Sequence, residues 1–225
     1  RQMCIRDRYH INWCKNKLSQ LLQGRQGTPS QVEGTSIATG MDYRMNVYWS
    51  NFAPLDIINT THPIPFSKYI EPESLINSRF NFKFNDMTTF EDFQKCPAYI
   101  DYTKNTFVLK FPFDYHLDFD FEKGVVNSDM FDQNFYDKVL MIRSMENRIF
   151  TLNSLFLFKP EKPVMMECFG PHFSDNDFTR KAMLIPGQFD AGKWFRFLEC
   201  AFVLKDGMKE LTINRGDAYA YLRFK

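Results

Sequence analysis

The chain has 225 residues, with 28 lysines and arginines against 27 aspartates and glutamates, and a formal net charge of +1. Nucleic-acid binding depends on clustered basic side chains, and the sequence shows no basic stripe, so we expect no nucleic-acid partner. No apolar run approaches the roughly 20 residues that cross a bilayer, so we expect no membrane partner either.

The first 40 residues differ in composition from the rest of the chain. Gln2–Asp7 resembles the in-frame translation of a transposase sequencing adapter, and Tyr9–Gly40 contains none of the 25 phenylalanines. Gln23–Gln31 is polar and turn-forming, which is typical of a linker or a disordered segment. We therefore expect residues 1–40 to be an adapter artefact and a disordered or non-native arm, and residues 41–225 to be a single β-rich domain. Truncation at the C-terminus is a further expectation, because the chain stops directly after an apolar run.

The middle of the chain begins with a loop and continues with strands. Asn51–Glu73 holds four prolines and few periodic apolar residues, which indicates a loop along the edge of the domain. Thr106–Phe111 is apolar, β-branched and aromatic, as expected of a strand. In the next strand, residues 115–121, apolar and polar residues alternate strictly, which predicts that Tyr115, Leu117, Phe119 and Phe121 face the core. Lys123-Gly124 predicts a turn and Val125-Val126 the return strand.

The second half of the chain predicts two hairpins. Leu155–Phe158 and Val164–Phe169 flank the five-residue loop Lys159–Pro163, and Leu211–Asn214 and Ala218–Phe224 flank Arg215-Gly216-Asp217. Between them, Phe195–Leu204 predicts a further strand that Lys205-Asp206-Gly207 ends. One helix is predicted after Ser128, which is a suitable N-cap, with Phe131, Phe135 and Leu140 near helical spacing.

Short strands with proline and glycine between them, and little helix, determine the expected fold class. We expect a mainly β fold, an antiparallel β-sandwich that is jelly-roll-like, with at most one or two short helices. Four cysteines remain after the adapter segment: Cys14, Cys96, Cys168 and Cys200. No two have zinc-ligand spacing and they are too sparse for a disulfide framework, so we expect buried free thiols and a reducing compartment.

Four segments together resemble a protein family of marine tailed phages, particularly myovirus-type cyanophages. They are Val47–Phe52, then Cys96–Asp101 with Lys104–Phe107, then Ile185–Gly187 with Gly192–Arg196, and last Arg215–Asp217 with Tyr221–Phe224. The likeness spans most of residues 45–224 in the same order. It implies a phage origin, a location in the host cytoplasm or the virion, and other phage proteins as partners. It supplies no catalytic residue.

One group of residues has the composition of a metal site. His116, Asp118 and His172, with Arg180, resemble the facial triad of jelly-roll, non-haem iron, 2-oxoglutarate-dependent oxygenases. Residues i and i+2 of a strand point the same way, and two imidazoles with one carboxylate leave open positions on Fe(II). The same pattern is also that of the solvated face of a half-buried strand, and we favour that interpretation.

Two further motifs have a structural and a functional interpretation. Arg215-Gly216-Asp217 matches an adhesion tripeptide, but between two strands we interpret it as a turn. Trp194, with Lys193 and Arg196, has the composition of a binding hot spot. We favour a core tryptophan at the start of a strand there, and likewise a structural role for Tyr48–Phe52.

The sequence contains no phosphate-binding glycine loop and no nucleophile elbow, so we expect no cofactor. The favoured hypothesis is a non-enzymatic phage accessory protein, with a binding or virion-associated role. The alternative is an iron oxygenase that uses His116, Asp118 and His172.

Overall fold

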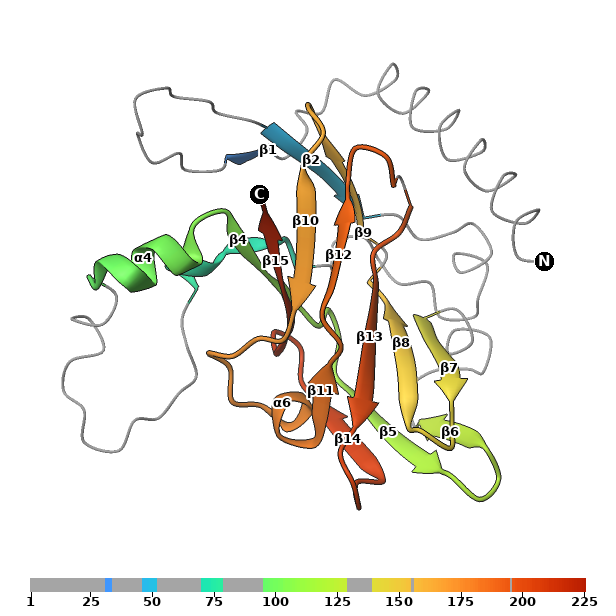
Figure 1. Ribbon diagram of the computed structural model, residues 1–225. Coiled ribbons are helices and arrows are strands. Elements are labelled where there is room, and N and C mark those ends of the chain that lie inside the picture. The colour runs from blue at the N-terminus through green and yellow to red at the C-terminus, as the bar shows by residue number, and fades with distance from the viewer. Residues whose placement is uncertain are drawn as a thin grey trace.

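The computed structural model describes residues 31–33, 46–51, 70–78, 95–128, 139–154, 156–194 and 196–225 (Figure 1). For residues 31–33, 46, 50 and 51 it describes the backbone alone. The described chain is mainly β, with antiparallel sheets and two short α-helices, α4 (Pro97–Thr103) and α6 (Asp177–Lys181). The expected class, an antiparallel β-sandwich with at most two short helices, is confirmed. Neither helix in this part of the chain is long and apolar enough to cross a membrane.

The strands form two layers. Contacts between rings and between sulfur atoms group the four sheets: β12-β10-β15-β4-β3 and β14-β5-β6 form the first layer, and β1-β2-β9 and β11-β13-β8-β7, which pack against them, form the second. The strands of the first layer are β3 (Glu73–Ser74), β4 (Thr106–Lys110), β5 (Tyr115–Asp120), β6 (Val125–Ser128), β10 (Met165–Phe169), β12 (Gly187–Asp190), β14 (Glu210–Ile213) and β15 (Ala218–Phe224). Those of the second are β1 (Gln31–Glu33), β2 (Asn46–Asn51), β7 (Leu140–Ser144), β8 (Ile149–Asn153), β9 (Phe156–Pro160), β11 (Ala182–Leu184) and β13 (Glu199–Leu204).

A bent two-stranded ribbon joins the two sheets of the first layer. β4 pairs with β15 and β5 pairs with β14, so residues 106–118 run antiparallel to residues 210–223. A bulge between Ala218 and Ala220 shifts the register of β15 against β4. Beyond the bulge, Lys110 pairs with Ala218 and Tyr115 pairs with Ile213 in one register. We call the bend between these two pairs the corner. Two backbone bonds hold the corner, from Phe111 N to Asp217 O at 2.8 Å and from Gly216 N to Phe111 O at 2.9 Å. The register is therefore the same on both sides of the bend, although the ladder is interrupted at residues 111–114 and 214–217.

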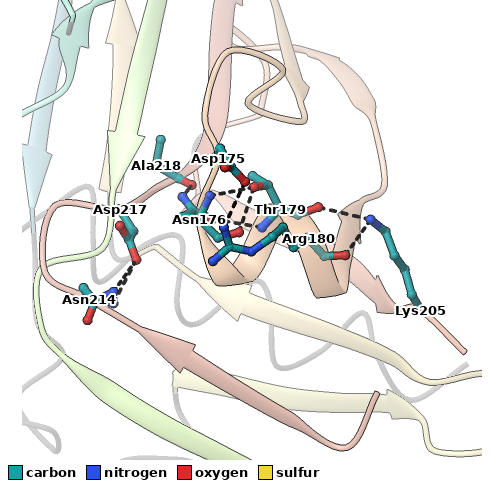
Figure 2. A network of polar contacts seen from close by, with 8 residues as sticks. All are labelled: Asp175, Asn176, Thr179, Arg180, Lys205, Asn214, Asp217 and Ala218. Atoms are coloured by element: carbon teal, nitrogen blue, oxygen red, sulfur yellow. Dashed lines mark hydrogen bonds and ion pairs between the residues drawn. The ribbon is translucent and has the colours of Figure 1, made fainter. Parts of the chain in front are cut away.

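Polar side chains fix the same corner (Figure 2). The Asp217 carboxylate accepts hydrogen bonds from Asn214 N at 2.9 Å and from Asn214 Nδ2 at 3.2 Å. Gly216 has a φ of 95°, and Asp217 N donates to Asn214 O at 3.0 Å, so the predicted turn at residues 215–217 is confirmed. Buried Asn176 caps α6 through Thr179 N and donates from Nδ2 to Ala218 O at 2.9 Å. These bonds attach α6 to the bulge of the ribbon.

Phenylalanine rings fill the space between the layers. Phe119 on β5 lies 4.7 Å from Phe150 on β8, and Phe158 on β9 lies 5.9 Å from Phe224 on β15, between ring centroids. On β5, Leu117 and Phe119 are buried and Asp118 is exposed. The prediction that the odd-numbered residues of this strand face the core is confirmed.

Both predicted hairpins are wrong. β9 pairs with β2, whereas β10 pairs with β12 and β15, so Lys159–Pro163 carries the chain between the layers. β14 pairs with β5, whereas β15 pairs with β4 and β10, so the Arg215–Asp217 turn bends a ribbon instead of closing one. A turn signal in the sequence locates a reversal or a bend, but it does not say which sheet the next strand joins.

Four other expectations differ from the structure or lie outside the described residues. Leu140, placed in the predicted helix, begins strand β7, and residues 129–138 are not described. The strand predicted from Phe195 begins at Glu199. Within the expected arm, Gln31–Glu33 forms β1 and pairs with β2, so this part of the arm joins a sheet. Residues 52–69 of the predicted edge loop also lie outside the described residues.

Alanine substitutions on the two faces of β5 should have very different costs. Leu117→Ala and Phe119→Ala each remove a buried side chain and leave a cavity, so each should lower the free energy of unfolding by about 2–5 kcal/mol. Asp118→Ala on the exposed face should change it by less than about 0.5 kcal/mol. Urea denaturation measures all three. Asp120 is a poorer control, because its carboxylate accepts hydrogen bonds from Glu122 N and Lys123 N. Similar costs on both faces would contradict the layered arrangement.

The bend at Gly216 gives a second prediction. An alanine there must adopt the positive φ of 95°, so Gly216→Ala should cost about 1–2 kcal/mol of unfolding free energy. Gly187→Ala is the matched control, because no atom lies within 4 Å of its added Cβ and its φ is not positive. A denaturation midpoint that is equally unaffected in both variants would show that the corner does not depend on the glycine.

Candidate functional site

The outer face of the β12-β10-β15-β4 sheet, opposite the main core, carries the candidate site. On β10, Met166 and Cys168 belong to the main core, so Glu167 and Phe169 alternate onto the outer face. Part of that face is covered, because Leu75, Val108, Ala218 and Tyr221 form a second small core there with Phe169 and Phe173 packed against it. Beside this second core lies an open hollow of about 400 Å³. We call it the outer-face hollow, lined among others by Tyr102, Glu167, Phe169, His172, Gln188 and Arg223.

A row of polar residues crosses the floor of the outer-face hollow. Strand pairing places Gln188 opposite Glu167, Glu167 opposite Arg223, and Arg223 opposite Thr106. Arg223 Nε donates to Thr106 Oγ1 at 3.1 Å, and Arg223 Nη1 lies 3.8 Å from Glu167 Oε2. Lys225 Nζ also donates to Glu167 Oε1. Glu167 is thus shared between two cationic side chains, Arg223 in the lining of the hollow and Lys225 beside it.

Two aromatic rings hold the Arg223 guanidinium in place. Its Cζ lies 4.5 Å from the ring centroid of Tyr102 on α4 and 4.9 Å from that of Phe169 on β10. Its Nη2 donates to Tyr102 O at 2.8 Å, a carbonyl in the last turn of α4 that lacks an intrahelical partner at that end. The side chain is 19% exposed. Two rings and two hydrogen bonds thus fix the plane of the guanidinium before any ligand arrives.

His172 forms one wall of the outer-face hollow. Its ring is stacked on Phe169 with centroids 5.8 Å apart, and it meets Tyr221 edge-on at 6.5 Å. Burial raises the pKa of Tyr221 to about 12, so the tyrosine stays a neutral phenol beneath the hollow at physiological pH. Phe173 N donates to the Tyr221 hydroxyl at 3.3 Å, which fixes the turn that carries His172.

The Arg223 guanidinium offers hydrogen-bond donors to a ligand in the hollow. A contact of 3.8 Å is an ion pair without a hydrogen bond, so Arg223 Nη1 keeps donor capacity for a ligand beyond Glu167. A planar guanidinium matches the oxygens of a carboxylate or phosphate. Because arginine stays protonated in proteins, Arg223 can donate hydrogen bonds to a ligand but cannot transfer a proton to it.

The structure does not bring the predicted iron triad together. His116 lies on β5, where its Nδ1 is 3.2 Å from Thr212 Oγ1, and Asp118 is exposed on the same strand. His172 stacks on Phe169 beside the other sheet of the layer, and Arg180 pairs with Asp175 at 3.1 Å (Figure 2). Among the described residues, which include all four, no group of three His, Cys, Asp or Glu side chains could hold a metal ion. The geometry gives the oxygenase alternative no support.

The expectation for Trp194 is wrong, because this side chain is 46% exposed. Arg196 lies over its ring at 4.1 Å, and Phe189 packs beside it at 6.2 Å between centroids. The turn that presents it is held by the Asp190 carboxylate, which accepts hydrogen bonds from Gly192 N and Lys193 N. Trp49, by contrast, packs edge-on against Phe156 at the main core, as expected.

Sequence reasoning did not identify Arg223 as a site residue. The sequence did contain one indication of its role: Arg223 is the only charged residue in the run Ala218–Phe224, which is otherwise apolar or aromatic. A charge at a half-buried strand position needs partners, and such partners gather at binding sites. What the sequence did not contain was the contact with Tyr102, which lies 121 residues away.

Because the triad residues lie apart, Fe(II) should not stabilise the protein. Iron bound at 100 times its dissociation constant would add about 2.7 kcal/mol to the unfolding free energy, which a thermal melt detects easily. We expect no change in Tm on anaerobic addition of Fe(II) with 2-oxoglutarate. A rise in Tm that His116→Ala and His172→Ala abolish, and His62→Ala does not, would restore the oxygenase hypothesis.

The chain was compared with protein-family models, with curated proteins and with solved structures. None of the three comparisons found a match. The functional argument therefore rests on the geometry of the outer-face hollow.

Proposed function

We propose that this protein is a non-enzymatic binding protein, a phage accessory or virion-associated component, whose ligand site is the outer-face hollow. The observation that carries the proposal is the Arg223 guanidinium, held between Tyr102 and Phe169 at the floor of an open hollow. A hollow of about 400 Å³ falls within the range typical of small-molecule sites. The phage assignment is supported by the four resembling segments named above.

The ligand we propose is an oxyanion, a carboxylate or a phosphate, on an apolar or aromatic body. Arg223 is a cation in the lining of the hollow, and the carboxylate nearest to it, Glu167, also pairs with Lys225, which favours an anionic ligand at Arg223. Phe169 and His172 offer ring surfaces at the wall, which favour a flat apolar group next to that anion. Because the guanidinium is already ordered by its protein contacts, little conformational entropy is lost when the ligand binds.

Titration of the ¹⁵N-labelled protein with benzoate, phosphate, benzamide and benzamidine tests this function. Benzoate and phosphate should shift amide resonances of residues 167–170, 172, 187 and 188, whereas neutral benzamide and cationic benzamidine should not. Arg223→Lys keeps the charge and loses the planar fork, so it should weaken benzoate binding by at least about tenfold, or 1.4 kcal/mol.

Arg143→Lys is the matched control. Arg143 is also a strand arginine paired with a carboxylate, Glu199 at 2.9 Å, but it lies on β7 in the second layer. Benzoate affinity should be unchanged in that variant. Equal losses in both variants, or no shift with either anion, would contradict a binding site at the outer-face hollow. Mass spectrometry of gradient-purified virions tests the virion role separately.

A further inference from the structure

Two thiols meet between the layers of the sandwich. Cys168 lies on β10 in the first layer and Cys200 lies on β13 in the second, and both are buried. Their sulfur atoms are 3.6 Å apart, in direct contact. Both are described as free cysteines, in agreement with the sequence expectation of buried thiols. The contact between the two sulfur atoms does not involve Arg223.

The surrounding strands hold these two thiols opposite each other. β10 is paired on both sides, with β12 and β15, and β13 is paired on both sides, with β11 and β8. A disulfide needs about 2.05 Å between the sulfurs, so they must approach by roughly 1.5 Å, which side-chain rotation and small strand shifts can supply. No other described cysteine is as close to either: Cys96 precedes α4 and is partly exposed.

We propose that Cys168 and Cys200 form a disulfide that links the two layers when the protein meets a small disulfide oxidant. One thiol loses its proton and attacks the oxidant, which forms a mixed disulfide and releases one reduced thiol. The second cysteine then attacks the mixed disulfide, closes the Cys168–Cys200 bond and releases a second reduced thiol. Two electrons pass to the oxidant, which also takes up the two thiol protons.

Burial of the two thiols makes their oxidation slow, and the redox state of the compartment decides whether the dithiol or the disulfide is present. The hydrogen bond with Cys168 and burial both raise the pKa of the Cys200 thiol, so the reactive thiolate is scarce in the closed fold. Oxidation therefore requires a local opening, for which β12 is suited, since it is an exposed edge strand beside β10. A reducing cytoplasm keeps the dithiol, and an oxidising medium converts it.

The disulfide would affect both stability and the outer-face hollow. It would join residues 32 positions apart and thereby restrict the unfolded chain. Cys168 lies between Glu167 and Phe169, two residues that line the hollow, so the bond would also fix the strand that forms its floor.

The test uses the full chain with Cys4→Ser, Cys14→Ser and Cys96→Ser, so that only the core pair remains. After incubation with oxidised glutathione, we expect both thiols to be lost and a Cys168–Cys200 peptide to appear in non-reducing mass spectrometry. Tm should rise by about 5–10 °C and return to its starting value with dithiothreitol.

Cys200→Ala and Cys168→Ala in the same background are the controls, and neither should gain stability from the oxidant. The proposal is overturned if both thiols of the folded triple variant stay titratable while the urea-unfolded chain is oxidised. It is also overturned if only glutathione adducts form, or if the internal disulfide lowers Tm. Because the readouts are thiol content and Tm, failure here would leave the benzoate experiment unaffected.

Discussion

The antiparallel pairing of residues 106–110 with 218–223 and of residues 115–118 with 210–213, on the two sides of one bend, is the constraint on which the rest of the structure depends. Two sheets of one layer share these two strand segments, so the bend at Phe111 and Gly216 sets the angle between the sheets. The main core then forms against the concave side, where Phe119 meets Phe150 and Phe224 meets Phe158. The outer face of the β12-β10-β15-β4 sheet carries Arg223. Core and site are thus opposite faces of the same ribbon.

Local patterns predicted which residues form strands and which face of a strand is buried. Strict alternation at 115–121 identified Leu117 and Phe119 as core residues, because side-chain direction in a strand alternates residue by residue. Gly216 predicted a turn for an equally local reason, because glycine readily adopts the positive φ that it has in the structure. Strand pairing was not accessible in this way. β9 pairs with β2 and β15 pairs with β4 across more than a hundred residues of sequence, and this pairing depends on the assembled layers.

The candidate site was still less accessible from the sequence. The residues that line the outer-face hollow come from α4, β10, β12 and β15 among other segments, and no spacing rule in the sequence connects Tyr102 with Arg223. The His116–Asp118 pattern, which looked like chemistry, is instead the polar side of a strand in contact with Thr212. Trp194 was misjudged because its ring area suggests burial, whereas Arg196 and Phe189 cover only part of it. The type of a residue indicates that its side chain needs contacts, but it does not say which residues of the fold supply them.

The position of β15 in its sheet has a consequence for synthesis on the ribosome. This strand lies between β10 and β4, and both of these are translated earlier. Neither can complete its pairing until residues 218–224 have left the exit tunnel, so β4 must wait for more than a hundred residues of further translation. During that interval the edges of two strands rich in phenylalanine and methionine remain open to other chains. The nascent chain should therefore depend on chaperones until β15 has left the exit tunnel.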